Sequence, residues 1–369
     1  MFTGLISQET FHTLAGEAET PLVTVVLPFH NEGSQANENA RRLHAALAGL
    51  EQQLAAFGLS PKGCGQFLAP ARAYADEQLG KPKGDETLVL FLSPSMFKAF
   101  VLPGSLPEMA VVGRHFAVAP LLPRLHKHAS CFLLPLSKKH VHLLLLSEEG
   151  MKEVAVDGMP KNYTLFSAGN EPRQESSQSK AGPQDTSKLD LQAYIRKVTK
   201  HVDDALKGRH EPLIFVGIDE EWGMFRQAIG YSHVIDSSIG KNPETISAEE
   251  LEAGAVEMLA PLWDKEKAVV LESYGSLAGT GRTSVDLQAI LDLAANGKVD
   301  TLLVAEGVTQ WGAVHVDSGV AALHERQENG DEELISLAAV HALRHKGWVQ
   351  SFPLAQMPEG KMAAAILRY

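Results

Sequence analysis

The spacing of apolar positions predicts a buried strand followed by a long helix in the first third of the chain. Residues 21–29 (PLVTVVLPF) are apolar and β-branched, which is typical of a strand inside a sheet. Residues 37–56 place leucines at helical spacing, at Leu43, Leu47, Leu50 and Leu54. Further predicted elements are strands at residues 87–92 and 97–102 and a proline-punctuated connector at residues 119–128.

The second third predicts a β-meander, a polar loop, an amphipathic helix and a strand at residues 213–217. Residues 167–188 hold no apolar side chain larger than alanine and proline, so we expect an exposed or disordered loop there. Ser187 and Asp190 predict a capping box at the start of the helix. The meander strands are residues 131–137, 140–147 and 151–156. The predicted apolar face of the helix consists of Leu191, Ile195, Val198, Val202 and Leu206.

The last third alternates helix and strand, a pattern typical of a small α/β sandwich. The predicted helices are residues 248–262, 265–277, 285–295 and 333–345. The predicted strands are residues 300–304, 348–351 and 363–367. The fold class expected for the whole chain is therefore α/β.

Length and composition fit two or three globular domains in a reducing cytoplasm. The chain has 369 residues, 44% of them hydrophobic and 21% charged, which excludes a largely disordered chain, a coiled coil and a collagen-like polymer. No apolar run reaches the ~18 residues of a membrane-spanning helix, and the first residues lack the pattern of a secretory signal. Cys64 and Cys131, the only cysteines, can form neither a disulfide framework nor a cysteine-based zinc site.

Charge is distributed unevenly along the chain. The net charge of −12 argues against a surface that coats nucleic acid over its whole extent. Residues 236–369 hold 10 Lys and Arg against 20 Asp and Glu, whereas residues 121–235 hold 15 against 14 and seven histidines. Different thirds of the chain are therefore expected to meet different partners.

Two motifs resemble a nucleotide site and a metal site, but the sequence favours neither. Residues 275–284 (GSLAGTGRTS) resemble a phosphate-binding loop, but the glycine spacing is one residue too long and Arg282 stands where lysine is required. A turn between helices is the preferred interpretation. The pairs at His126 with His128 and at His140 with His142 suit a strand face, yet no carboxylate or thiol joins them at a tidy spacing. No cofactor and no metal are expected.

Two features of the middle third point to an anionic partner. Arg196, Lys197 and Lys200 lie on the polar side of the predicted helix, where a solvated face and phosphate contact are alternative interpretations. Gly182, Pro183 and Gln184 come just before a helix start, where free N–H groups favour phosphate or an oxyanion. A surface loop with an incidental glutamine is the alternative.

The order of several segments resembles a known family. These segments are LVTVVLPFHNE, PLIFVGIDEEWGMFRQA, GKNPET, GRTSVDLQAILDLAANGKVDTLLVAEG and the ending from ELISLAAVHALRHKGW onward. Together they resemble the bacterial homologues of the archaeo-eukaryotic class 1 release factor and Pelota, over nearly the whole chain. The resemblance implies an N-terminal α/β domain (1–125), an RNase H-like middle domain (126–235) and a C-terminal domain similar to the kink-turn-binding ribosomal proteins (236–369).

The resemblance also implies a function. Release factors carry Gly-Gly-Gln on a middle-domain loop that helps water cleave peptidyl-tRNA, and the matching residues here are Gly182, Pro183 and Gln184. Pro183 replaces a glycine, which fixes φ and removes an N–H. The sequence thus favours a cytoplasmic factor for ribosome rescue or hibernation that contacts ribosomal RNA or tRNA, with a possible protein partner at the acidic C-terminal domain. The alternatives are a metal-dependent hydrolase unrelated to translation and a protein-interaction module.

Overall fold

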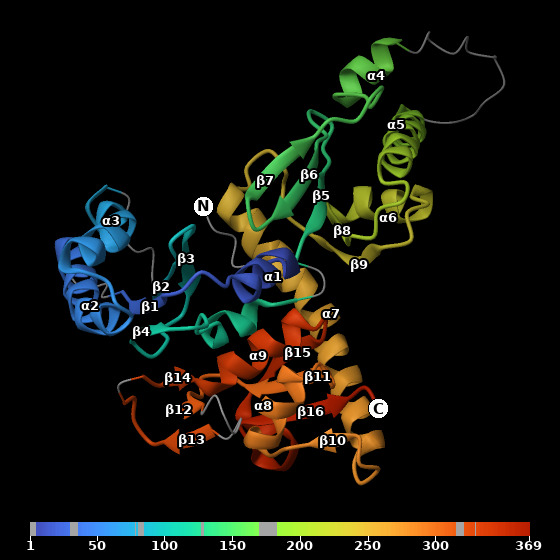
Figure 1. The fold of residues 1–369 in the computed structure, drawn as a ribbon. Coiled ribbons are helices and arrows are strands. Elements are labelled where there is room, and N and C mark those ends of the chain that lie inside the picture. The colour runs from blue at the N-terminus through green and yellow to red at the C-terminus, as the bar shows by residue number, and fades with distance from the viewer. Residues whose placement is uncertain are drawn as a thin grey trace. The chain divides into compact units, whose positions relative to one another are not determined.

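The computed structural model describes residues 5–29, 36–77, 79, 85–126, 129–169, 183–314, 321–328 and 330–369. Several sheets and helices confirm the predicted mixed α/β class (Figure 1). The chain divides into two compact units. We call Lys127–Lys265 the middle unit, and Gly4–His126 together with Glu266–Tyr369 the composite unit. The division into three domains stays a prediction, as do the RNase H-like and kink-turn-related descriptions.

The N-terminal half of the composite unit is an antiparallel sheet with the strand order β3-β2-β1-β4. Its strands are β1 (Leu22–Pro28), β2 (Glu86–Leu92), β3 (Phe97–Pro103) and β4 (Met109–Gly113), and its helices are α1 (Gln8–Gly16), α2 (Ala36–Ala56) and α3 (Pro61–Glu77). The predicted strands and the long helix are thereby confirmed. All four leucines predicted for the apolar face of α2 are buried, and they pack with α3 against one face of the sheet.

The C-terminal half of the composite unit is a second sheet, with the strand order β10-β16-β11-β15, and a small sheet with the order β13-β12-β14. The strands are β10 (Thr283–Ser284), β11 (Val299–Ala305), β12 (Trp311–Val314), β13 (Ala321–His324), β14 (Glu332–Glu333), β15 (Trp348–Phe352) and β16 (Ala363–Leu367). The other elements of this half are α8 (Leu287–Ala295), α9 (Leu334–Arg344) and the 3-10 turns η2 (Leu354–Gln356) and η3 (Pro358–Gly360). A further 3-10 turn, η1 (Ala119–Arg124), belongs to the N-terminal half.

One prediction for this region is wrong. Instead of two helices at residues 248–262 and 265–277, the structure has a single helix, α7 (Ala248–Leu277), with Pro261 inside it. A proline inside a helix removes one hydrogen bond, but buried positions on both sides of it, such as Leu259 and Trp263, keep the helix continuous by packing.

The two halves of the composite unit share one hydrophobic core. Side chains of the N-terminal sheet, including Phe91 and Phe100, belong to the same buried cluster as Leu334 and Ile335 of α9. Polar contacts accompany this packing: the Ala119 N–H donates to Ser336 Oγ at 2.8 Å, and Arg344 donates to the Ala15 and Glu17 carbonyls. Segments from opposite ends of the chain therefore fold as one body.

The middle unit contains a five-stranded sheet with the order β7-β6-β5-β8-β9. Its elements are β5 (Cys131–Pro135), β6 (Leu143–Ser147), β7 (Gly150–Val154), α4 (Tyr163–Gly169), α5 (Pro183–Ala205), β8 (Leu213–Val216), α6 (Asp219–Ala228) and β9 (Val234–Ile239), with the first part of α7. Strands β5, β6 and β7 pair antiparallel in succession, which confirms the predicted meander. Strands β8 and β9 continue the sheet in parallel with β5.

Within the described part of the chain, no helix is at once long enough and apolar enough to cross a lipid bilayer.

Candidate functional site

Helix α5 presents a buried apolar face to the sheet of the middle unit. The five residues predicted for this face are all buried, with relative exposures of 5% or less. Tyr194 lies on the same face, and the core around it includes Phe215 and Phe225. The apolar pattern of the sequence thus fixes which side of α5 is turned toward water.

The opposite side of α5 carries the predicted cations. Arg196, Lys197 and Lys200 are exposed, and Lys207 is exposed just beyond the end of the helix. We call these four residues the α5 cationic surface. Among the described residues, none of the four side chains has an ion-pair or hydrogen-bond partner. Because Arg196 and Lys200 are four residues apart, their like charges oppose helix formation by about 0.2–0.5 kcal/mol, and an anionic partner would remove this cost.

The predicted glutamine tip falls at the edge of the described structure. Gly182 lies outside the described residues, and so does most of the predicted loop, residues 170–182. The ends of that loop are helical: residues 167–169 belong to α4, and α5 begins at Pro183. The backbone of Gln184 is therefore helical, whereas its side chain is not among the described parts of the structure.

The predicted start of α5 at a capping box is consequently wrong. Ser187 lies inside the helix rather than before it. Proline is favoured at the first helical position, because its fixed φ suits the helix and its missing N–H would have no partner there. The apolar pattern begins only at Leu191, so it gave no signal for the first two turns.

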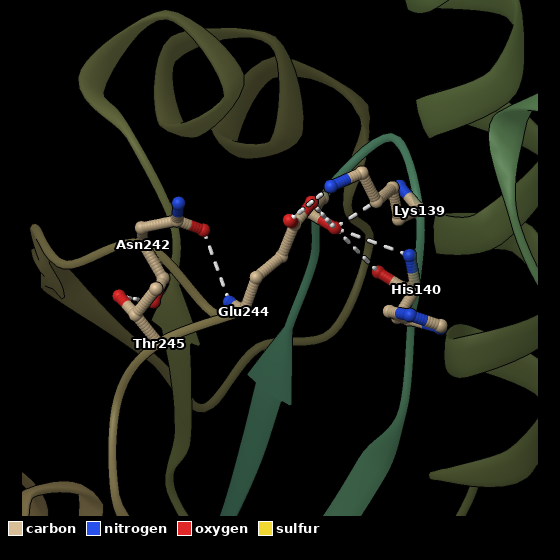
Figure 2. Close-up of polar contacts among 6 residues, drawn as sticks. Lys139, His140, Asn242, Glu244 and Thr245 are labelled. Carbon is tan, nitrogen blue, oxygen red and sulfur yellow. Dashed lines mark hydrogen bonds and ion pairs between the residues drawn. The ribbon is translucent and has the colours of Figure 1, made fainter.

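The GKNPET segment folds against the turn between β5 and β6 (Figure 2). Lys139 Nζ lies 2.7 Å from Glu244 Oε2, and Asn242 Oδ1 accepts a bond from the Glu244 N–H at 3.0 Å. The hydrogen bond from Lys139 is the main cause that lowers the pKa of Glu244. Ser137 Oγ accepts bonds from the Lys139 and His140 N–H groups, both at 3.1 Å. These contacts hold two loops together and are satisfied internally, so they assign this segment a structural role.

The histidine pairs do not assemble a metal site within the described residues. His140 and His142 lie side by side with their ring centroids 6.1 Å apart, and His142 Nδ1 is 2.8 Å from Glu153 Oε1. His128 lies outside the described residues, and His126 is buried in the composite unit, where desolvation, followed by Lys267 and Arg124, lowers its pKa to about 3. Across the described ranges, no three His, Cys, Asp or Glu side chains come together in a way that could hold an ion.

In the segment at residues 275–284, which resembles a phosphate-binding loop, Arg282 and the glycines have structural roles. Helix α7 precedes it, as predicted, and Arg282 donates from Nη2 to the Leu367 and Arg368 carbonyls at 3.2 and 3.1 Å. Gly279 and Gly281 have φ values of 76° and 82°, which suit a tight turn. Arg282 thus anchors β10 beside β16 instead of offering its charge to a phosphate.

Behind α5 lies a pair of buried polar groups that no pattern in the sequence indicates. Tyr194 is fully buried, and its hydroxyl has no hydrogen-bond partner in the part of the chain that the structure describes. Glu221, in the first turn of α6, is also buried, and desolvation raises its pKa. Desolvation, with a smaller contribution from Glu221, raises the pKa of Tyr194. Both groups are thereby biased toward their neutral forms.

Residues 132–298 match the sequence profile of the bacterial archaeo-eukaryotic release factor family 3. The predicted family resemblance is confirmed for this segment. The matched segment is just under half of the chain and contains both the α5 cationic surface and the glutamine tip. No curated protein matches the chain.

Solved structures with similarity to this chain come from archaea and yeast. The archaeal translation termination factor aRF1 has 14% identity and a TM-score of 0.24, with 100% of both chains covered. Archaeoglobus fulgidus Pelota has 12% identity and a TM-score of 0.34, covering 100% of this chain and 94% of its own. Saccharomyces cerevisiae Dom34 has 10% identity and a TM-score of 0.35, with 74% of each chain covered. All three TM-scores are below 0.5.

Proposed function

We propose that this protein is a ribosome-associated translation factor that acts in rescue or hibernation, with α5 facing ribosomal RNA or tRNA. The observation that carries the proposal is the α5 cationic surface, within the segment that matches a release-factor family. Phosphate groups are the anions that a stripe of free Lys and Arg side chains recognises on RNA. A local cationic surface in a protein of net charge −12 also restricts contact with RNA to this side of the middle unit.

We further propose that binding occurs without peptidyl-tRNA hydrolysis. Gly182, Pro183 and Gln184 stand in place of Gly-Gly-Gln, and Pro183 has no N–H and a fixed φ. The start of α5 at Pro183 supports this view, because a proline in the first helical turn restricts the freedom that a second glycine provides. Gln184 and Gly182 then belong to the tip without a catalytic role.

The acidic C-terminal third is proposed to bind a protein instead of RNA. Residues 236–369 carry twice as many acidic as basic residues, so phosphate groups are repelled over most of that surface. A basic protein surface, either ribosomal or of another translation factor, is the complementary partner. A footprint in which residues 236–369 lie broadly on ribosomal RNA would contradict this assignment.

The test is co-sedimentation of the purified full-length protein with ribosomes at low and moderate salt. The wild-type protein is expected to pellet with ribosomes at low salt, and the triple variant Arg196→Ala, Lys197→Ala, Lys200→Ala is expected to pellet much less. A control with the same charge change replaces three exposed lysines of the composite unit by alanine: Lys62, Lys298 and Lys361. Absence of ribosome binding by folded wild-type protein, or equal losses in both variants, would refute the proposal.

A further inference from the structure

A second feature of the middle unit lies at the end of α5, at the edge of the sheet where β8 and β9 begin. The chain leaves α5 through Gly208, whose φ of 80° ends the helix, and then enters β8 at Leu213. The loop after α6 enters β9 at Val234. Between these two loops lies an open depression of about 400 Å³. Its lining includes Lys207, Arg209, His210, Tyr231 and His233.

Three of the lining rings contact one another edge to face. The ring centroids of His210 and His233 are 5.4 Å apart with an interplanar angle of 81°, and those of Tyr231 and His233 are 5.5 Å apart at 66°. Both histidines are exposed, and Tyr231 is half-buried. In an edge-to-face contact, one ring presents only its edge, so its own faces remain available to a further flat ring.

The rings are held in place by hydrogen bonds of their loops. Tyr231 Oη donates to the Glu211 carbonyl at 2.7 Å, and the Leu213 N–H donates to the His233 carbonyl at 2.8 Å. Asp203 of α5 accepts the N–H groups of Gly230 and Tyr231, at 2.9 and 2.8 Å. The platform formed by the His210, Tyr231 and His233 rings is therefore preorganised, so binding of a ligand would not require the entropic cost of ordering these rings.

The acidic side chains at this place already have hydrogen-bond partners. The Asp203 carboxylate is occupied by the two backbone donors, and the Glu211 carboxylate forms a bidentate pair with Arg209 at 3.1 and 2.6 Å. Lys207, in contrast, has no partner among the described residues. Lys207 also belongs to the α5 cationic surface, about 10 Å further along the helix direction than Lys200. The depression is thus open to an anion on the same side as the other cations.

We infer that this depression binds an unpaired nucleotide of RNA, with the base stacked on the His210, His233 and Tyr231 rings and the adjacent phosphate at Lys207. Flat rings beside a free cation are the combination with which proteins hold single-stranded RNA. A base in a duplex has both faces covered by its neighbours, so the depression selects unpaired segments. The inference rests on the proposed ribosome function only for the source of the RNA, because the site itself is tested on the isolated protein.

The experiment measures fluorescence anisotropy of labelled single-stranded hexaadenylate, and of an RNA duplex with an equal number of phosphates, with purified full-length protein. We expect the single strand to bind more tightly than the duplex. His210→Ala with His233→Ala should weaken single-strand binding at least about 5-fold, the lower limit for loss of one stacked base. His210→Phe with His233→Phe should retain most of the affinity, because phenylalanine keeps a ring for stacking.

The matched control is His140→Ala with His142→Ala, which removes another pair of neighbouring rings from the same unit, at the opposite ends of the strands. Equal losses in this control, no loss in the His210 and His233 alanine variant, or a phenylalanine variant as weak as the alanine variant would overturn the inference. Ribosome co-sedimentation distinguishes the two proposals. Ring-dependent hexaadenylate binding without ribosome binding refutes only the proposed function, whereas ribosome binding without ring-dependent hexaadenylate binding refutes only the inference.

Discussion

Replacing Tyr194 by phenylalanine is expected to stabilise the middle unit. The Tyr194 side chain has 0% exposure, and its hydroxyl finds no hydrogen-bond partner in the described part of the chain. An unsatisfied buried hydroxyl costs about 1–3 kcal/mol of folding free energy, because its hydrogen bonds to water are lost and not replaced. Phenylalanine removes the oxygen but retains the ring that packs on Tyr163 and Phe166 at centroid distances of 5.8 and 5.7 Å.

The expected gain can be read from amide hydrogen exchange of α5 peptides. This measurement follows the opening of the middle unit itself, and a gain of about 1.4 kcal/mol slows exchange roughly tenfold where closing is faster than the chemical exchange step. Tyr163→Phe is the matched control, since it removes a hydroxyl from a half-buried tyrosine beside the same ring. A control effect within about 0.5 kcal/mol is expected.

The opposite result would refute the reasoning. If Tyr194→Phe speeds exchange in α5 while Tyr163→Phe does not, the Tyr194 hydroxyl must have a partner, and a water shared with Glu221 would be the first to consider. Tyr194→Leu separates the two contributions of the side chain. It removes both the hydroxyl and the ring contacts, so it should destabilise the unit even if the phenylalanine variant stabilises it.

Three further results are expected. Each phosphate contact contributes about 0.7–0.9 to the slope of log affinity against log salt. The triple alanine variant of the α5 cationic surface should therefore show a ribosome-binding slope that is shallower by about 2–3. An unchanged slope would contradict phosphate contact. Gln184→Ala and Pro183→Gly should both bind ribosomes normally and release no peptide from peptidyl-tRNA. Gln184-dependent peptide release by the wild-type protein would refute the proposal that binding occurs without hydrolysis. Burial lowers the pKa of His126 to about 3 and that of His341 to about 4. Below pH 6.5 these histidines therefore take up protons in the unfolded chain before they do so in the folded protein. The composite unit should consequently lose stability as the pH falls toward 4. Equal melting temperatures at pH 7 and pH 5 would contradict this last expectation.

Local patterns predicted the elements whose faces differ strongly in polarity. The leucines of α2 and the apolar face of α5 are examples, since each of these faces is buried as a whole. Helix α3 was missed because it contains Gly63, Gly65 and Pro70, which disfavour helix formation. Its buried residues Cys64, Leu68, Ala71 and Ala75 nevertheless recur at helical spacing, so tertiary packing overrides the weak propensity.

Long-range features were not accessible from the sequence. The shared core of the composite unit joins residues more than two hundred positions apart, and no local spacing indicates which apolar face meets which. The ring platform of His210, Tyr231 and His233 was missed for the same reason, because it forms only when β8 and β9 pair. The α5 cations, in contrast, were predictable, since a single helix places them and their exposure follows from the apolar face.

The composite unit has a consequence for synthesis of the protein on the ribosome. The N-terminal sheet is complete when residue 113 has emerged, but α9, whose side chains belong to the same buried cluster, ends only at Arg344. At the usual elongation rates of about 5–20 residues per second, the interval between them lasts on the order of ten to forty seconds. During that time Phe91 and Phe100 lack the neighbours that the C-terminal half contributes to their buried cluster, so the nascent chain exposes apolar surface while the middle unit is being made. Such exposed surface is prone to aggregation, and a circular permutant that joins the two halves directly would shorten the interval during which it is exposed.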